Sequence, residues 1–241
     1  MEKKEDLKKR IIVALDVGRK KDALSLVEKV KEAEIFKIGL ELFASEGPSL
    51  FEEIKRKRKK IFLDLKCHDI PNTVAGAVRA ASRHGVFMLT LHSSGGREMM
   101  AKAAATAAEE AQKEKKTKPL LLAVTVLTSL KDEQLREIGI EGDVSQQVLH
   151  LANLAREAGM DGVVCAPQEI EIIKREFGKD LLVVTPGIRP SWAASHDQKR
   201  IMTPAEAYKK GADYLVIGRP IIEAPSPERA FLQIVEELDT A

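Results

Sequence analysis

The chain has 241 residues, of which 44% are hydrophobic and 32% charged, a composition that excludes a disordered or collagen-like protein. The 39 Lys and Arg residues nearly balance the 37 Asp and Glu residues, so bulk electrostatic attraction to nucleic acid is not expected. Aromatic residues make up 4% and leave few stacking surfaces for single-stranded nucleic acid. The two cysteines, Cys67 and Cys165, are too few for a disulfide scaffold and are typical of a reducing compartment.

The amino-terminal residues 1–10 are mostly charged, and no apolar stretch of signal-peptide type follows them. The apolar run at 11–15 is only five residues long, whereas a membrane-spanning helix needs roughly 18. We therefore expect a cytoplasmic protein that does not bind membranes.

Eight short apolar runs recur along the chain, most of them rich in Val, Ile, Leu and Phe and without clean polar alternation. They are Ile11–Leu15, Ile35–Leu40, Ile61–Leu65, Val86–Leu91, Leu120–Leu127, Gly162–Cys165, Leu181–Val184 and Tyr214–Ile217. Strands that are buried on both faces, as in parallel sheets, have this composition.

Segments with helical periodicity separate these runs. Between Met99 and Ala111, apolar residues recur at i, i+3, i+4 and i+7, and a similar face ends at Gly159. Helix boundaries are further indicated by prolines at expected starts and glycines at expected ends, namely Pro71, Pro204, Pro227, Gly85, Gly178 and Gly211. Eight strand–helix alternations without a linker predict one domain over residues 1–241, a (β/α)8 TIM barrel with eight parallel strands.

The strongest charge run, Lys55–Lys60, follows the second predicted strand. We interpret it as the solvated end of the second helix, where cations suit the helix dipole, in preference to a nucleic-acid-binding patch.

A barrel of this kind carries its active site where the strands end and the following loops begin. Polar residues gather at those positions along most of the chain. They include Asp16, Lys37, Asp64, Lys66, Asp69, Thr73, His92, Thr128, Ser129, Arg189, Gly218 and Arg219.

The third strand carries the densest signal. Asp64 and Lys66 are two residues apart, so both side chains should point into the barrel, close to Lys37 of the neighbouring strand. A self-satisfied structural ion pair is one interpretation, but buried pairs stabilise less than apolar packing, so a functional role is favoured. Asp69 would complete a set of two cations and two carboxylates.

The end of the eighth strand indicates an anion site. Gly218 allows a ligand to approach the backbone, and the planar guanidinium of Arg219 suits phosphate oxygens; the alternative is a tight turn with a surface arginine. The long segment 186–202 is a candidate lid, in which Gln198 could donate an amide hydrogen to the phosphate.

Other types of site have weaker support. His68, Asp69 and His92 could suggest a metal, but their spacing is not that of a metal motif, and no glycine-rich dinucleotide motif follows a strand. The two cysteines show no catalytic pairing.

The block Asp64-x-Lys66-x-x-Asp69-Ile70-Pro71-Asn72-Thr73 resembles the signature of the orotidine 5′-phosphate decarboxylases. The likeness extends along the chain through Leu15-Asp16, Phe36-Lys37-Ile38-Gly39, His92 with Gly95-Gly96, Leu127-Thr128-Ser129, Thr185-Pro186-Gly187-Ile188-Arg189, Asp197-Gln198 and Gly218-Arg219.

This resemblance implies decarboxylation of orotidine 5′-monophosphate to uridine 5′-monophosphate and CO2 in pyrimidine biosynthesis, without a metal or an organic cofactor. It also implies a homodimer in which Asp69 and Thr73 reach into the partner's site. The resemblance implies that Lys66, held by Asp64 and Asp69, protonates C6, and that Lys37 and Asp16 contact the ribose. It implies pyrimidine contacts from Thr128 and Ser129. It also implies phosphate contacts from Arg219, Gly218 and Gln198, with Arg189 supporting the lid.

Two alternatives remain at this stage. Magnesium-dependent sugar-phosphate decarboxylases or aldolases share the barrel and the Asp-x-Lys pair, although the Ile70–Thr73 continuation argues against them. A non-catalytic nucleotide-binding protein is the other, but a pure binder has little use for a buried set of alternating charges.

Overall fold

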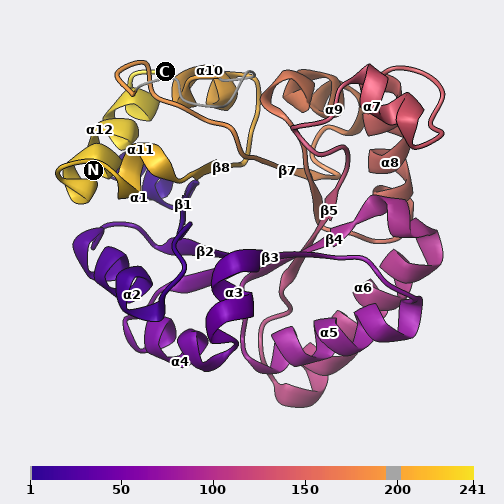
Figure 1. The fold of residues 1–241 in the computed structure, drawn as a ribbon, viewed down its shortest axis with the longest axis horizontal. Coiled ribbons are helices and arrows are strands. Elements are labelled where there is room, and N and C mark those ends of the chain that lie inside the picture. The colour runs from indigo at the N-terminus through magenta and orange to yellow at the C-terminus, as the bar shows by residue number, and fades with distance from the viewer. Residues whose placement is uncertain (1, 194–201) are drawn as a thin grey trace.

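The computed structural model, which describes residues 2–193 and 202–241, is a closed barrel of eight parallel strands (Figure 1). Each strand pairs with the next in the sequence, and β8 pairs with β1. The fold class predicted from the sequence is confirmed. The strands are β1 (Ile11–Ala14), β2 (Ile35–Gly39), β3 (Lys60–Cys67), β4 (Met88–His92), β5 (Leu120–Val124), β6 (Gly162–Val164), β7 (Leu182–Thr185) and β8 (Tyr214–Ile217).

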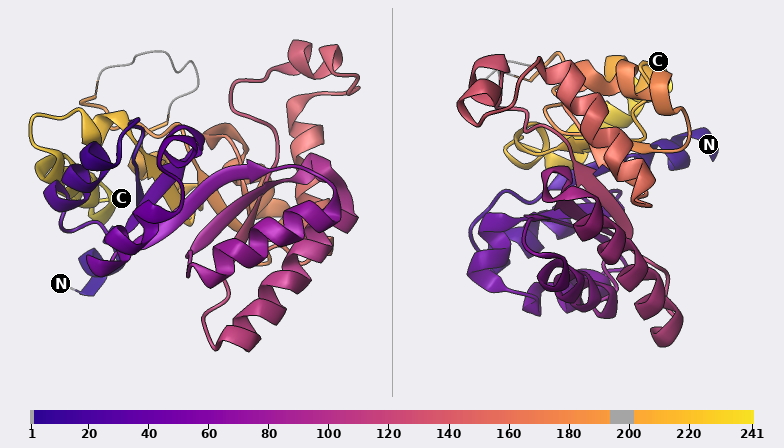
Figure 2. Two further views of the ribbon diagram at one scale, coloured as in Figure 1. Left: turned by 60° about the horizontal axis from the view of Figure 1, so that its bottom comes forward. Right: turned by 90° about the vertical axis from the view of Figure 1, so that its right-hand side faces the viewer.

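Helices surround the strands, as the two side views in Figure 2 show. They are α1 (Glu2–Lys8), α2 (Lys20–Lys29), α3 (Leu40–Glu46), α4 (Ser49–Arg56), α5 (Pro71–Arg83), α6 (Gly96–Glu114), α7 (Asp132–Glu137), α8 (Val144–Glu157), α9 (Ile170–Phe177), α10 (Pro204–Lys209), α11 (Arg219–Ile222) and α12 (Pro227–Asp239), with 3-10 turns at Ser93–Gly95 and Pro167–Glu169. No helix within the described ranges is long and apolar enough to cross a membrane.

Proline and glycine mark the helix boundaries as predicted. Pro71, Pro204 and Pro227 are the first residues of α5, α10 and α12, where a missing backbone N–H costs nothing. Gly159 and Gly178, beyond the ends of α8 and α9, have φ angles of 77° and 54°, which residues with a Cβ atom adopt at a cost.

Two apolar clusters hold the barrel together. The larger lies between the strands and the helices, and the smaller comprises alternate strand residues that point inward: Ile12, Ala14, Ile35, Phe62, Met88, Leu122, Val184 and Val216. Since strand side chains alternate, the next inward position on each strand lies nearer the carboxyl end of the barrel. That layer is where the polar side chains begin.

Several predicted boundaries were wrong. The fifth strand ends at Val124 instead of Leu127, whose side chain is exposed. The expected second helix is two helices, α3 and α4, because Gly47 has a φ of 63° and Pro48 follows it. The charged amino terminus forms α1, which packs against α12 and buries Leu7.

The basic run at 55–60 covers the end of α4, a turn and the first residue of β3, so only part of it ends a helix. Four of its six side chains have partners on neighbouring elements: Lys55 donates to the His84 carbonyl, Lys57 to Glu28, Lys59 to the Lys31 carbonyl and Lys60 to Glu34. These contacts give the run a structural account.

Candidate active site

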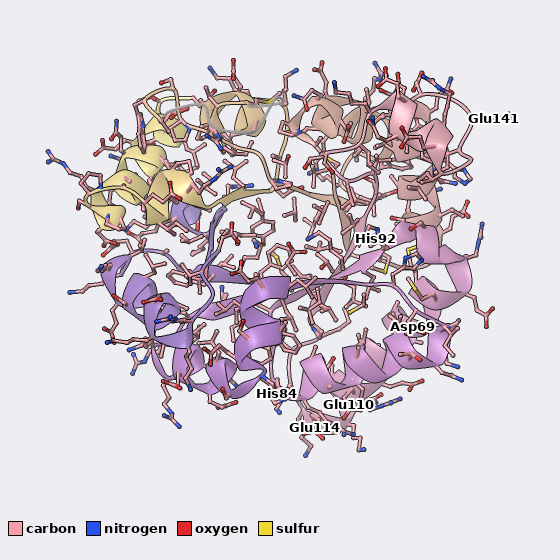
Figure 3. The ribbon with its side chains drawn as sticks, in the orientation of Figure 1. Asp69, His84, His92, Glu110, Glu114 and Glu141 are labelled. Carbon is pink, nitrogen blue, oxygen red and sulfur yellow. The ribbon has the colours of Figure 1, made fainter. Side chains whose placement is uncertain are left out.

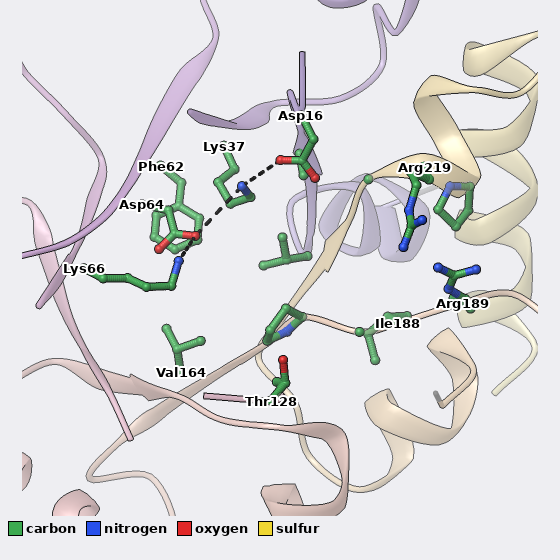
Figure 4. Close-up of a pocket in the computed structure, with 16 residues that line it drawn as sticks. Asp16, Lys37, Phe62, Asp64, Lys66, Thr128, Val164, Ile188, Arg189 and Arg219 are labelled. Atoms are coloured by element: carbon green, nitrogen blue, oxygen red, sulfur yellow. Dashed lines mark hydrogen bonds and ion pairs between the residues drawn. The ribbon is translucent and has the colours of Figure 1, made fainter. Parts of the chain in front are cut away.

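A pocket of about 290 Å³ opens at the carboxyl ends of the strands, directly above the inner apolar layer (Figure 4). Apolar side chains form part of its lining, and charged side chains lie along two sides. The lining residues are Ala14, Asp16, Lys37, Phe62, Asp64, Lys66, Thr128, Val164, Pro186, Gly187, Ile188, Arg189, Val216, Gly218, Arg219 and Pro220.

The charged residues continue the inward-facing rows of the strands. Lys37 lies two residues beyond Ile35 on β2, and Asp64 lies two beyond Phe62 on β3. Asp16 follows Ala14 in the same way, just after β1 ends. Alternation along three adjacent strands therefore brings these side chains together over an apolar floor.

The four charges form one row, Asp16–Lys37–Asp64–Lys66. Nζ of Lys37 lies 3.1 Å from Oδ1 of Asp16 and 3.9 Å from Oδ2 of Asp64, and Nζ of Lys66 lies 2.9 Å from the same Oδ2 (Figure 4). The Lys37 and Asp64 side chains are only 11% and 14% exposed, so each depends on its neighbours to offset desolvation. The two outer members, Asp16 and Lys66, are open to the pocket.

Lys66 joins this row from a β-bulge in β3, which the sequence did not predict. Leu63 pairs with Leu89 and Cys67 pairs with Leu91, so β3 uses four steps where β4 uses two. Lys66 lies in this bulge with a φ of 51°, and strand alternation alone does not explain its direction.

The buried hydroxyl of Thr90, on β4, fills the gap that the bulge leaves. It accepts a hydrogen bond from the Lys66 backbone N–H at 2.9 Å and donates one to Oδ1 of Asp64 at 2.9 Å. The sequence analysis missed Thr90, because a threonine in an apolar strand carries no charge signal. Its inward position, two residues after Met88 of the inner layer, was the available clue.

Arg189 and Arg219 line the pocket on the side away from Lys66 (Figure 4). Arg189 follows β7 and is 4% exposed, and its backbone N–H donates to the carbonyl of Met202. Arg219 follows β8 directly after Gly218, whose backbone also faces the pocket. Lys66 and the two guanidinium groups thus lie at opposite sides of one pocket, while Asp16, at the other end of the charge row, lies beside Gly218.

The remaining predicted residues lie at or outside the margin. Thr128 lines the pocket from the connection after β5, whereas the exposed Ser129 is not among the lining residues. Asp69 and Thr73 are exposed, and the Asp69 carboxylate accepts the Ile70 N–H at 2.6 Å. Figure 3 shows Asp69 near α5, away from the barrel centre. Gln198 lies outside the described residues.

His68 and His92 lie beside the row, with ring centroids 5.6 Å apart. Burial lowers the pKa of His92, and the nearby His68 and Lys66 lower that pKa further. Within residues 2–193 and 202–241, no three or more His, Cys, Asp or Glu side chains are grouped closely enough to hold a metal ion. Burial raises the pKa of both cysteine thiols, which disfavours the reactive thiolate.

Comparisons with known proteins identify the family of the chain. A family model described as "Orotidine 5'-phosphate decarboxylase / HUMPS family" matches residues 9–234. The chain is 52% identical over 236 residues to the orotidine 5′-phosphate decarboxylase of Trichlorobacter lovleyi, covering 98% of this chain and 97% of that protein. It is 48% identical over 233 residues to the enzyme of that name from a Nostoc species, covering 96% and 98%.

A solved structure gives the same result for the fold. The crystal structure of the orotidine 5′-phosphate decarboxylase of Lactobacillus acidophilus superposes with a TM-score of 0.85 at 36% identity, covering 96% of this chain and 99% of that one. Residues 9–234, which the family model matches, include all eight strands and every residue that lines the pocket. The chain belongs to the orotidine 5′-phosphate decarboxylase / HUMPS family.

Proposed function

We propose that this protein is a carboxy-lyase that converts orotidine 5′-monophosphate to uridine 5′-monophosphate and CO2, in pyrimidine biosynthesis. One observation carries the proposal: a row of alternating charges ends at Lys66, on the side of the pocket away from Arg189 and Arg219. The two ends of orotidine 5′-monophosphate suit these two sides of the pocket. Negative charge develops on its pyrimidine ring during the reaction, and its phosphate binds cationic side chains. Membership of the family supports the same reaction.

The pocket suggests one orientation for the nucleotide. The phosphate binds Arg219 and the Gly218 backbone, which line the pocket, and also Gln198, as the family resemblance implies. Arg189 supports the segment that follows β7. The ribose hydroxyls meet Asp16, at the acidic end of the row, and Lys37 beside it. The pyrimidine then lies beside Lys66, with Thr128 and Ser129 at its edge.

Decarboxylation breaks the bond between C6 and the carboxylate carbon. CO2 leaves, the electron pair stays on C6, and the ring offers no adjacent electron sink. The ammonium of Lys66 stabilises this developing charge, then donates its proton to C6 and is reprotonated from solvent. Asp64 holds the ammonium in place through its 2.9 Å contact.

The active form in this proposal is a homodimer. Asp69 and Thr73 are exposed at the beginning of α5, on the same side of the barrel as β3, and are free to contact a second copy. Asp69 of each subunit then completes the charge row of its partner.

A magnesium-dependent relative on the same barrel is the main competing function. Here the carboxylates of Asp16 and Asp64 are already matched by the ammonium groups of Lys37 and Lys66. A divalent cation at this place would lie close to two positive charges, which disfavours its binding. The proposed reaction therefore uses only the chain's own charges.

The direct test follows the pyrimidine ultraviolet absorbance of orotidine 5′-monophosphate, mixed with the purified protein in excess EDTA. We expect conversion to uridine 5′-monophosphate. Activity that appears only on a sugar phosphate and only with magnesium would overturn the proposal in favour of the competing enzyme. Tight nucleotide binding with no turnover of either substrate would make the protein a binder.

A further inference from the structure

We propose that the Thr90 hydroxyl is a positioning group for the reaction, which fixes both the backbone of Lys66 and the carboxylate of Asp64. The inference rests on the proposed decarboxylation for its kinetic part. Its structural part stands on the contacts alone.

The bulge in β3 creates the need for such a group. Between the pairs Leu63–Leu89 and Cys67–Leu91, the three residues 64–66 lie opposite Thr90 alone. In a regular parallel ladder, neighbouring backbone groups would satisfy the Lys66 N–H. In this structure a side-chain hydroxyl takes their place, at 2.9 Å.

The positive φ of Lys66 gives that hydrogen bond a role in holding the backbone conformation. A φ of 51° is disfavoured for a residue with a Cβ atom, so surrounding contacts must hold the conformation. Because Lys66 leaves the backbone in this conformation, a relaxation of φ would move the whole side chain. The hydrogen bond to Thr90 opposes that relaxation at its origin.

The same hydroxyl gives the two carboxylate oxygens of Asp64 different partners. Thr90 donates to Oδ1, which leaves Oδ2 facing both ammonium groups, at 2.9 Å from Lys66 and 3.9 Å from Lys37. Thr90 is 0% exposed, so bulk water does not compete for its hydroxyl. One buried O–H group therefore fixes the positions of both the proton donor, Lys66, and its counterion, Asp64.

The test compares variants at Thr90 that differ in the hydroxyl. Thr90→Val keeps the shape and removes the hydroxyl, while Thr90→Ala and Thr90→Ser both lose the methyl and differ only in the hydroxyl. Thr125→Val is the matched control, since Thr125 is also buried and its hydroxyl donates to the Val164 carbonyl at 3.0 Å. In Thr125→Val, the Val164 carbonyl still accepts a hydrogen bond from the backbone N–H of residue 125, so the substitution leaves this acceptor paired.

We expect kcat to fall by about 10- to 100-fold in Thr90→Val and Thr90→Ala, with KM changed by less than about threefold, because a small misplacement of a catalytic group is costly. Thr90→Ser should recover most of the kcat, and Thr125→Val should retain it. If Thr90→Val fails to fold, the Ala and Ser pair still isolates the hydroxyl. Equal kcat values for Ala and Ser would overturn the inference.

A second readout needs no turnover. Hydrogen exchange of the Lys66 amide, followed by NMR, should be faster in Thr90→Val than in the unmodified protein, because its acceptor is gone. Unchanged exchange would overturn the inference. If the unmodified protein does not decarboxylate the nucleotide, the proposed function fails, and amide exchange alone decides whether Thr90 holds Lys66.

Discussion

Asp16 and Gly218 meet where the first and last strands of the barrel close. A Cβ atom on Gly218 would lie 2.9 Å from Oδ2 of Asp16 and 3.4 Å from Cβ of Ala14. The other Asp16 oxygen accepts the hydrogen bond from Lys37. The absence of a side chain at 218 therefore gives the acidic end of the charge row its place.

Gly218→Ala should displace the Asp16 carboxylate and lengthen its contact with Lys37. We expect kcat/KM to fall about tenfold or more, because a small displacement of a binding group is costly, with little change in the free energy of unfolding, because the clashing oxygen ends a half-exposed side chain that can move. Steady-state kinetics and urea denaturation measure the two effects. A variant with unchanged kcat/KM would show that Asp16 tolerates displacement.

Lys66→Ala removes the proposed proton donor. Turnover should fall by at least about 100-fold, whereas uridine 5′-monophosphate should still bind through the phosphate side of the pocket. Lys210→Ala is the matched control, because Lys210 is not among the pocket-lining residues and pairs with Glu171 on the surface, where such pairs contribute little. Kinetics and a binding titration separate the two effects, and near-normal turnover would contradict the role of Lys66.

Arg219→Ala tests the phosphate side. For orotidine 5′-monophosphate, kcat/KM should fall by about 10- to 100-fold, since a hydrogen bond to a charged group contributes roughly 1.5–3 kcal/mol. For orotidine, which has no phosphate, the same substitution should have little effect. Equal losses with both substrates would mean that Arg219 acts on the fold or on the pyrimidine instead.

A subunit-mixing experiment tests the shared site. Lys66→Ala and Asp69→Ala should each be nearly inactive alone, but a 1:1 mixture of reassorted subunits should regain about a quarter of the normal activity, because half of the dimers then hold one intact site out of two. Activity is measured after co-expression and compared with the parents. A mixture no more active than its parents would argue against an Asp69 contribution across the interface.

His92 should make the protein less stable in mild acid. Its folded pKa is lowered by burial and by His68 and Lys66, so between that value and the unfolded value of about 6.5 the unfolded chain binds more protons. The free energy of unfolding should therefore fall as the pH drops through about 6.5. Urea denaturation from pH 8 to 5 should show this slope, and His92→Gln should reduce it. An identical slope in the variant would assign the acid sensitivity to other groups.

The strands were predictable because both faces are buried, which leaves apolar runs that differ from the amphipathic helices between them. The errors in strand and helix assignment arose where the local composition does not report the secondary structure. Leu127 belongs to the connection after β5 although it extends an apolar run. α1 was missed because its buried residue, Leu7, is surrounded in the sequence by charged residues.

The charged side of the site was predictable because charges in apolar strands stand out and alternation gives their direction. For Lys66 the prediction that it lies beside Asp64 is confirmed, but the reason given for it was incomplete, since Lys66 lies in a bulge with a positive φ. A register shift depends on pairing with another strand, and no local pattern reports it. The contribution of Thr90 could be seen only once that shift was known.

The closure of β1 against β8 has a consequence for synthesis on the ribosome. Asp16 is made about 200 residues before Arg219, so the pocket is complete only after β8 has been made and has paired with β1. A chain that stops before β8 holds the charge row but leaves the hydrogen-bonding edges of β1 and β7 exposed. Premature termination therefore yields inactive fragments that invite aggregation or proteolysis, and partial activity from a truncated chain is not expected.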